Sequence, residues 1–238
     1  MRILALDSSA TQASVAILDD NVIIGEFFIN TKLTHSTTLI AMCNALLENT
    51  QTDISTIDAY AVNAGPGSFT GVRIGVAGIK GMAWTANKPC VSISTLDCIA
   101  QNLKGTACVI CAVMDARCNQ FYNSIFSSNC KGEIVKLCND RALSYEELTN
   151  ELLSYSDKRI ILCGDGANIA YKLMSEKITN LEVASTHLIH QRAFGVGVLA
   201  QEKLLKNEYT TAKELMPVYL RLPQAQRDLK KKQSKGVN

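Results

Sequence analysis

The sequence contains no apolar run that approaches the roughly 18 residues needed to cross a bilayer. Its opening stretch, Met-Arg-Ile-Leu-Ala-Leu-Asp, reaches an acidic residue too early for a secretory signal peptide. From these two absences we expect a cytoplasmic protein without membrane contact. Charged residues make up only 19% of the chain and hydrophobic residues 47%, which excludes the composition of disordered proteins. With 238 residues the chain exceeds a typical single domain and predicts two domains of about 100 residues each.

A disulfide framework is also missing. The nine cysteines are odd in number and lie mostly in apolar runs such as Ala-Cys-Val-Ile-Cys-Ala-Val. Cys108 and Cys111 form a C-x-x-C pair, but their neighbours predict a strand, in which positions three apart point to opposite faces. No second ligand pair stands at a spacing suited to zinc. We therefore predict free thiols packed in the core.

The common phosphate-binding and nucleophile motifs are absent from the glycine-rich stretch Asn-Ala-Gly-Pro-Gly-Ser-Phe-Thr-Gly-Val-Arg-Ile-Gly at residues 63–75. A dinucleotide-binding fingerprint would need glycine where Thr70 stands, and a P-loop would need Gly-Lys-Ser or Gly-Lys-Thr, which the chain lacks. A hydrolase elbow around Ser68 would need glycine in place of Pro66 and Thr70. We therefore do not expect Ser68 to be a nucleophile.

The stretch instead continues into a predicted helix with few side chains on one face. Gly71, Gly75, Gly78 and Met82 fall at i, i+4, i+7 and i+11, so they share that face. Glycine inside a helix costs about 0.8–1 kcal/mol relative to alanine, so Gly75, Gly78 and Gly81 together cost roughly 2.5 kcal/mol. Such a cost indicates a close approach to the backbone. The spacing leaves open whether the protein's own sheet or helix approaches, or a helix of a second subunit.

The predicted elements repeat in the two halves of the chain. In the first half, strands at residues 3–7, 13–18 and 22–29 precede a helix around 39–47, a strand at 59–62, a helix ending near 86, a strand at 90–93 and a helix capped by Ser94 with Asp97 three residues on. In the second half, strands at 107–114, 120–126 and 133–137 precede a helix with a capping box at Ser144 and Glu147, a strand at 159–163, a turn at 164–166, a helix, a strand at 181–184 and a helix from 191.

This order predicts an α/β protein of the actin, sugar-kinase and Hsp70-like (ASKHA) class, with two ribonuclease-H-like lobes of duplicated βββαβαβα topology. Asp7 and Asp115 occupy matching positions at the end of each half's first strand. We place the two lobes at residues 1–104 and 105–206, followed by a C-terminal segment and basic tail at 207–238.

Four motifs carry a family resemblance: the opening Ile-Leu-Ala-Leu-Asp-Ser-Ser, the run Gly-Pro-Gly-Ser-Phe-Thr-Gly-Val-Arg-Ile-Gly, Asp-Ala-Arg from Asp115, and Pro-Val-Tyr-Leu-Arg from Pro217. Together they resemble the bacterial TsaB family, formerly called YeaZ, over nearly the whole chain. The resemblance implies an ASKHA fold and a role in making threonylcarbamoyladenosine, the modification beside the anticodon of tRNAs that decode codons beginning with A.

In that family the TsaB subunit does not perform the chemistry. It binds and activates the related subunit TsaD, which carries the metal and transfers the threonylcarbamoyl group, and the ATPase TsaE joins the complex. The resemblance thus implies a noncatalytic subunit with no cofactor, which forms a heterodimer with TsaD. We assign the partner contact to the helix residues Gly71, Arg73, Gly75, Gly78 and Met82, and expect the same face to pair with a second copy in a homodimer.

The histidines can be compared with the metal site of the catalytic subunit, which resembles an H-x-x-x-H pair on a helix plus a late aspartate. His35 is followed four residues later by Leu39, and residues 187–200 contain no acidic residue. One imidazole is a poor site for a metal that takes three protein ligands, so no metal site is predicted. We interpret His35 as a helix-start residue and expect His187 and His190 to be structural.

A nucleotide site is predicted only weakly, at Asp7, Ser8, Ser9 and Asp115, where this fold class turns two hairpins toward the cleft. Neither hairpin carries the glycines that let backbone amides approach a phosphate. The turn at residues 164–166 is a weak adenosine signal. We therefore expect weak or absent ATP hydrolysis by the isolated protein.

Two other functions and one further contact stay open. The first is an ATP-dependent small-molecule kinase or ATPase of the same fold, and the second, less favoured, is a metallopeptidase-like protein. Residues 224–238 hold five basic residues against Asp228, a net charge of +4, while the rest of the chain carries −2. Such a tail is typical of a solvated end, and secondly of an arm that makes weak tRNA contact.

Overall fold

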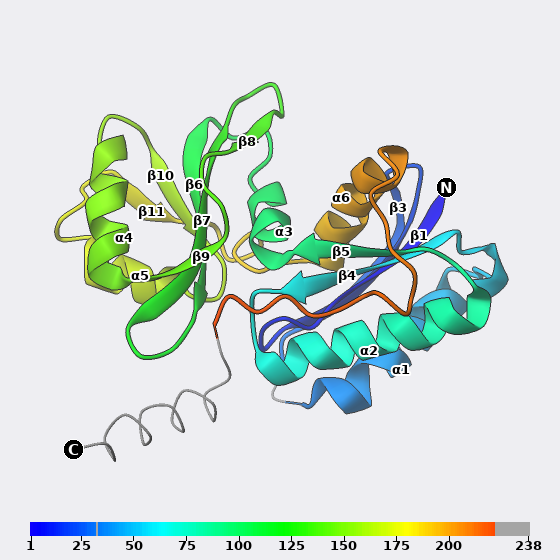
Figure 1. Cartoon of the computed structure of the whole chain (residues 1–238). Helices are drawn as coiled ribbons and strands as arrows, with labels where there is room; N and C mark the ends of the chain where they lie inside the picture. The colour runs from blue at the N-terminus through cyan, green and yellow to red at the C-terminus, as the bar shows by residue number, and fades with distance from the viewer. Residues whose placement is uncertain (32, 222–238) are drawn as a thin grey trace, which may run out of the picture.

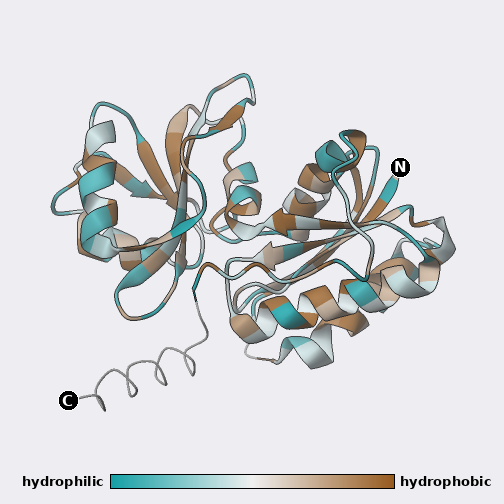
Figure 2. Ribbon diagram, in the orientation of Figure 1, coloured by the Kyte–Doolittle hydropathy of each residue, from teal (hydrophilic) through white to brown (hydrophobic). Residues whose placement is uncertain are grey.

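The computed structural model describes residues 1–31 and 33–221, so the basic tail at 224–238 lies outside the described residues. Two lobes lie side by side, each built on one sheet (Figure 1). Hydrophobic residues concentrate in the central strands of both sheets, as Figure 2 shows, because these strands are covered by helices. In the described part of the chain, no helix combines the length and apolarity needed to traverse a membrane.

The first lobe contains a five-stranded sheet in the order β3-β2-β1-β4-β5. Its strands are β1 (Arg2–Asp7), β2 (Ala13–Asp19), β3 (Val22–Ile29), β4 (Ala59–Gly65) and β5 (Cys90–Ser94). Helices α1 (His35–Asn49) and α2 (Phe69–Ala86) lie on one face of this sheet, and a 3-10 turn (Ile54–Thr56) precedes β4. Strands β1, β2 and β3 pair antiparallel and β4 and β5 parallel, as the duplicated pattern predicts.

The second lobe repeats this plan in the order β11-β10-β6-β7-β8. Its strands are β6 (Cys108–Asp115), β7 (Gln120–Ser128), β8 (Ile134–Lys136), β9 (Arg141–Ser144), β10 (Ile160–Cys163) and β11 (Leu181–Val183), and its helices are α4 (Tyr145–Leu152) and α5 (Ala167–Met174), with a 3-10 turn (Leu153–Tyr155) between them. The ASKHA fold is thereby confirmed. Strand β9, which pairs with β7, was not expected from the sequence, because it is only four half-buried residues long.

Two helices cross between the lobes. Helix α3 (Thr95–Gln101) follows the first lobe in the chain, yet Leu96 and Ile99 pack in the core of the second. Helix α6 (Ala193–Leu205) follows the second lobe, yet it packs against β1 and β2 through Val196 and Ala200. The division of the chain into lobes at 1–104 and 105–206 stays a prediction. Helix α6 belongs to the second of these ranges, but it packs on the sheet of the first lobe. The lobes are therefore joined by more than a linker.

The local predictions on caps are confirmed, and the prediction of buried free thiols holds for six of the nine cysteines. Ser144 and Glu147 form a capping box on α4, and the Ser94 hydroxyl accepts the backbone N–H groups of Leu96 and Asp97. All nine cysteines are free, and Cys108 and Cys111 are buried, although three others, Cys118, Cys130 and Cys138, are not. The C-x-x-C pair is a packing feature of β6.

The chain then runs along α2 as an extended segment, residues 207–221, which we call the C-terminal strap (Figure 1). Thr210 forms a β-bridge with Cys90, and the Val218 N–H donates to the Ala64 carbonyl at 2.7 Å. At its end, the Arg221 guanidinium donates to the carbonyl of Ala116 in the second lobe at 2.7 Å. The strap therefore connects the edge of the first sheet to the second lobe.

Candidate functional site

The glycine-rich stretch lies directly beneath the turn that joins β1 and β2. The Ser68 N–H donates to the Ser9 carbonyl at 2.7 Å, and the Ser8 hydroxyl donates to the Gly71 carbonyl at 2.9 Å. A Cβ at Gly71 would collide with the Ser8 carbonyl oxygen, and one at Gly75 would lie 2.5 Å from the Ser8 hydroxyl oxygen. The close approach that the glycines indicate is therefore that of the protein's own β1–β2 turn.

This arrangement corrects part of the predicted partner surface. Gly71 and Gly75 are buried, so they cannot offer bare backbone to a second subunit. The sequence left open which chain approaches these glycines, and it is the same chain, through Ser8. Gly78 is half-buried beside Ile40 of α1, whose Cδ1 would lie 3.5 Å from a Cβ at Gly78. Met82 is half-buried too. Ser68 caps α2 by accepting the Gly71 N–H at 3.2 Å, in line with a structural role.

Arg73 is exposed on α2, but its guanidinium is already engaged within the chain. Its Nε donates to the Tyr219 hydroxyl at 2.6 Å. The charge also lies 5.4 Å from the centre of the Tyr219 ring and 5.9 Å from that of Phe69, and these two rings stack at 4.7 Å. Arg73 thus fastens the strap onto α2. Neither aromatic partner was predicted, although Tyr219 stands within the Pro-Val-Tyr-Leu-Arg motif.

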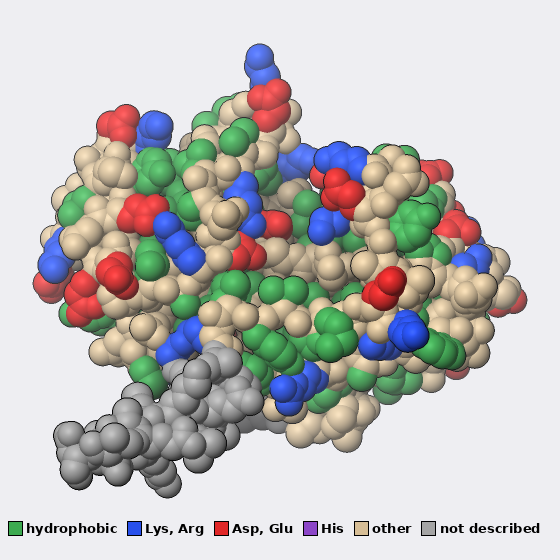
Figure 3. All heavy atoms as spheres, viewed as in Figure 1, with side chains coloured by type: hydrophobic (Ala, Val, Ile, Leu, Met, Phe, Trp, Pro, Cys, Tyr) green, Lys and Arg blue, Asp and Glu red, His purple; other side chains and the backbone are tan. Residues whose placement is uncertain are grey.

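The outward surface of α1 and α2 has a different character, and we call it the α1–α2 face: Ile40, Ala41, Asn44, Ala77 and Gly81. All five are exposed and none carries a charge. A Cβ at Gly81 would meet no atom within 4 Å, so this glycine borders open space. Figure 3 shows hydrophobic side chains gathered over α2 and the strap, with single basic side chains between them. The spacing of Ile40, Ala41 and Asn44 at i, i+1 and i+4 was the available sequence signal on α1.

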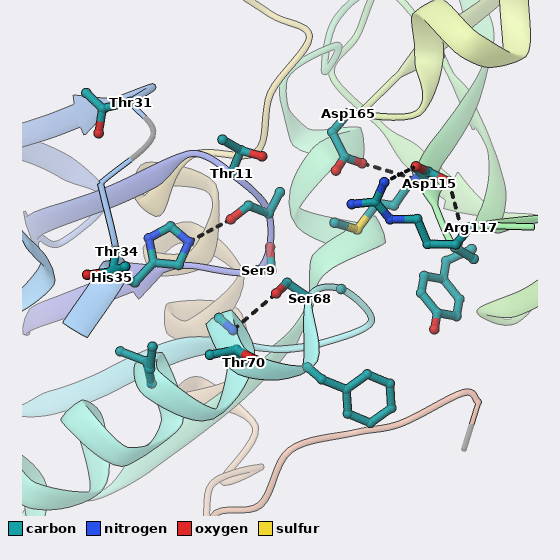
Figure 4. Close-up of a pocket in the computed structure, with 18 of the residues that line it drawn as sticks. Ser9, Thr11, Thr31, Thr34, His35, Ser68, Thr70, Asp115, Arg117 and Asp165 are labelled. Carbon is teal, nitrogen blue, oxygen red and sulfur yellow. Dashed lines mark hydrogen bonds and ion pairs between the residues drawn. The ribbon is translucent and has the colours of Figure 1, made fainter. Parts of the chain in front are cut away.

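A cleft of about 750 Å³ lies between the lobes. Figure 4 shows Ser9, Thr11, His35 and Ser68 on the side of the first lobe, and Asp115, Arg117 and Asp165 on the side of the second. The cleft thus occupies the place where the fold class was expected to bring its two hairpins together.

Of the four residues predicted for a nucleotide site, Ser9 and Asp115 line the cleft, whereas Asp7 and Ser8 lie buried outside its lining. The Asp7 carboxylate accepts hydrogen bonds from the Asn63 amide and the Ser9 hydroxyl, both at 2.7 Å. Burial raises the pKa of Asp7 above its ordinary value. Asp7 and Ser8 therefore shape the turn rather than contact a cleft ligand.

The second lobe lines the cleft with two carboxylates. The Asp165 carboxylate accepts the Asp115 N–H at 3.3 Å, and burial, assisted by the Asp115 charge, raises the pKa of Asp165 to about 6. The exposed Arg117 guanidinium lies 3.6 Å from Asp115. Residues 117–119 adopt positive φ without a glycine among them. This wall therefore carries two carboxylates against a single guanidinium, an unfavourable balance for a phosphate.

Two of the three histidines, His35 and His190, have contacts in keeping with structural roles, whereas His187 is exposed. His35 begins α1, as predicted, and its Nε2 lies 2.7 Å from the Ala10 carbonyl oxygen. His190 stacks near Phe28, with ring centres 6.3 Å apart, and burial lowers its pKa. Within residues 1–31 and 33–221, no group of three His, Cys, Asp or Glu side chains is placed to hold a metal ion.

Comparison with known proteins gives one consistent result. A family model described as "TsaD: tRNA N6-adenosine threonylcarbamoyltransferase" matches residues 23–229. The chain is 31% identical over 234 residues to the tRNA threonylcarbamoyladenosine biosynthesis protein TsaB of Haemophilus influenzae, covering 93% of this chain and 94% of the relative. It is 27% identical over 227 residues to TsaB of Bacillus subtilis, covering 95% and 96%. The structure of YeaZ from Pseudomonas aeruginosa, 25% identical, superposes with a TM-score of 0.79, covering 92% of this chain and 99% of that one.

Proposed function

The chain belongs to the TsaB (YeaZ) family, whose members act in tRNA threonylcarbamoyladenosine biosynthesis, and we propose that it is a noncatalytic subunit that binds and activates TsaD. The heterodimer with TsaD, the participation of the ATPase TsaE and a homodimer in the absence of TsaD are parts of this proposal. The observation that carries it is the α1–α2 face, an uncharged paired-helix surface in a member of this family.

The α1–α2 face has the properties of an interface. Its small residues Ala41, Ala77 and Gly81 let another backbone come near, and Ile40 supplies an exposed aliphatic side chain that is 45% accessible. Interface centres are depleted of charged residues, because each buried charge must be desolvated. We therefore assign the partner contact to the exposed side of α2 instead of to the buried glycines Gly71 and Gly75.

Activation would follow from differential binding. A subunit that binds the active arrangement of TsaD more tightly than its inactive arrangement raises the population of the active one by that ratio, about tenfold for each 1.4 kcal/mol. No catalytic group of this chain is needed. The rigid support of α2 by the β1–β2 turn and by the Arg73–Tyr219 contact keeps the face in one shape, which such selection requires.

The test is a charge placed on the face. Ala77→Glu is expected to weaken binding to purified TsaD at least about tenfold, because an unpaired carboxylate would be buried in the complex. Asn168→Glu on α5 adds the same charge at an exposed site of the other lobe and should bind like the wild type. Isothermal titration measures both, and tRNA modification by the reconstituted complex should fall in parallel. Equal binding by Ala77→Glu and the wild type would move the interface elsewhere.

The interlobe cleft favours one alternative, an ATP-dependent kinase or ATPase of the same fold. Its volume of about 750 Å³ is large enough for a nucleotide. Against this stand the carboxylates of Asp115 and Asp165 and the absence of glycine from the turn that carries Arg117. Titration with magnesium and ATP, followed by a phosphate-release assay, separates the two functions, and robust turnover by the isolated chain would favour the alternative.

A further inference from the structure

A second cavity lies where α2 ends, beside the beginning of the strap. It has a volume of about 410 Å³, within the range of small-ligand sites. Its walls include Trp84, Lys88 and Pro89 on one side and Tyr209 and Lys213 of the strap on the other. The Trp84 side chain is 63% exposed and Tyr209 is 50% exposed. An indole and a phenol left this open on either side of one cavity are unusual, since large aromatic side chains gain from burial.

The walls of this cavity, which we call the Trp84 pocket, are held in place by backbone hydrogen bonds. The Lys88 N–H donates to the Ala83 carbonyl at 3.1 Å, and the Asn87 N–H donates to the Trp84 carbonyl at 3.3 Å. On the opposite side, Thr210 exchanges two hydrogen bonds with Cys90, of 2.8 and 2.9 Å. The pocket is thus formed before any ligand arrives. These bonds also occupy carbonyls that would otherwise leave negative partial charge at the end of α2.

The polar groups around the pocket are free to bind a ligand. Over residues 1–31 and 33–221, neither the Lys88 nor the Lys213 ammonium forms an ion pair or a side-chain hydrogen bond. The Trp84 N–H and the Tyr209 hydroxyl likewise have no partner in that part of the chain. No carboxylate lines the pocket, and the nearby Glu214 is turned to Thr211, accepting its N–H at 3.1 Å and its hydroxyl at 2.8 Å. The pocket therefore combines an exposed aromatic face with two lysines that form no ion pair with the described residues.

We propose that the Trp84 pocket binds an unpaired nucleotide of an RNA. The base stacks on the indole of Trp84, and the adjoining phosphates meet the ammonium groups of Lys88 and Lys213. Aromatic platforms flanked by cations are the usual means of holding single-stranded nucleic acid, since every nucleotide brings a π-face and a phosphate together. An acidic peptide would satisfy the lysines but leave the indole face without a matching planar group. The inference rests on the proposed function in one respect, because that function makes a tRNA the natural source of such a nucleotide.

Tryptophan fluorescence reports on this pocket directly, because Trp84 is the only tryptophan of the sequence. The full-length protein is titrated with a single-stranded oligoribonucleotide, with a duplex of the same length and with a mononucleotide. We expect saturable quenching of Trp84 emission by the single strand and weaker responses from the other two. With two phosphates contacted, the logarithm of the affinity should fall with the logarithm of salt concentration with a slope of about −1.4 from the pocket.

Variants are compared by the anisotropy of a labelled single strand. Trp84→Ala should lower the affinity roughly 5- to 150-fold, the effect of losing one stacked base. The double variant Lys88→Glu, Lys213→Glu should lower it as well and flatten the salt dependence. The double variant Lys172→Glu, Lys177→Glu, at two exposed lysines of the other lobe, serves as the charge-matched control. All variants keep residues 222–238, so a contribution of the basic tail is constant. Trp84 is exposed, so its replacement should leave the melting temperature unchanged.

Several outcomes overturn the proposal: unchanged Trp84 emission, wild-type RNA affinity for Trp84→Ala, or a mononucleotide that binds as tightly as the single strand. Loss of TsaD binding by Trp84→Ala with RNA affinity intact would make the pocket a protein-docking site instead. The Ala77→Glu experiment keeps the two proposals apart. If Ala77→Glu disrupts the complex while the pocket binds no RNA, only the inference about the pocket fails.

Discussion

The Ser8 hydroxyl and the Gly71 carbonyl are joined by a hydrogen bond of 2.9 Å that links the β1–β2 turn to the first turn of α2. A Cβ added at Gly75 would lie only 2.5 Å from the same hydroxyl oxygen. The turn and the helix therefore fit together only because two helical positions one turn apart, Gly71 and Gly75, have no side chain. This contact gives α2 its position, and with it the position of the α1–α2 face.

Replacement by alanine should change the stability of the protein in opposite directions at two glycines of α2. Gly75→Ala is expected to destabilise the protein by about 1–3 kcal/mol, since the added methyl group overpacks a buried contact. Gly81→Ala, on the open side of the same helix, should stabilise it by up to about 1 kcal/mol through helix propensity. Urea unfolding of both variants measures the difference. Equal effects would mean that the Ser8 contact does not determine the packing. The same collision means that Gly75→Leu should impair folding.

Release of the strap is expected when Arg73 is shortened. Arg73→Ala removes both the hydrogen bond to the Tyr219 hydroxyl and the cation–π contact, whereas Tyr219→Phe removes the hydrogen bond alone. Limited proteolysis should therefore cleave the strap fastest in Arg73→Ala, more slowly in Tyr219→Phe and slowest in the wild type. Arg117→Ala, an exposed arginine whose guanidinium pairs with Asp115 instead, is the control. Identical cleavage rates in all four proteins would contradict this role of Arg73.

The Asp165 carboxyl predicts a pH dependence of stability. Its pKa is raised to about 6 in the folded protein from an unfolded value near 3.8, so the folded state holds the proton more tightly. The stability due to this group is complete below pH 4 and is lost as the pH rises toward 6 and beyond. Compared with the wild type, Asp165→Asn should lose less stability between pH 4 and 7, by about 1–2 kcal/mol. Urea unfolding at several pH values tests this, with the exposed Asp157→Asn expected to follow the wild type.

Anion binding in the cleft should be limited by charge. We expect weak or undetectable binding of ADP to the wild type in isothermal titration, since Asp115 and Asp165 face the cleft. Asp115→Asn removes one of these charges and should raise the affinity, most clearly at low ionic strength. Tight binding by the wild type, weakened by Asp115→Asn, would instead assign this carboxylate to a nucleotide site.

The sequence predicted the fold well because its elements are signalled locally. Strands β1, β2 and β3 are apolar runs separated by tight turns, and the α4 capping box is visible as Ser144 and Glu147. Strand β9 escaped because four half-buried residues carry no periodic pattern. The placement of α3 and α6 on opposite lobes also escaped, since packing partners distant in the sequence leave no local mark.

The candidate site was predicted less well. The glycine spacing correctly indicated a close approach to α2, but which chain makes the approach depends on Ser8, 63 residues away from Gly71. Arg73 was selected for the right helix, yet its partner Tyr219 is 146 residues away. Contacts of such sequence separation cannot be inferred from residue types in a single sequence. The exposed side of α1 could have been found, because its uncharged positions recur at helical spacing.

The exchange of α3 and α6 has a consequence for any attempt to divide the molecule. A fragment ending at residue 104 would lack the helix that covers Ile3 and Ala5, and the complementary fragment would lack the one that covers β6. Each would expose an apolar sheet surface to water and be prone to aggregate. The two pieces would therefore have to be produced together to yield a native molecule, and genes that encode proteins of this kind should tolerate fission poorly.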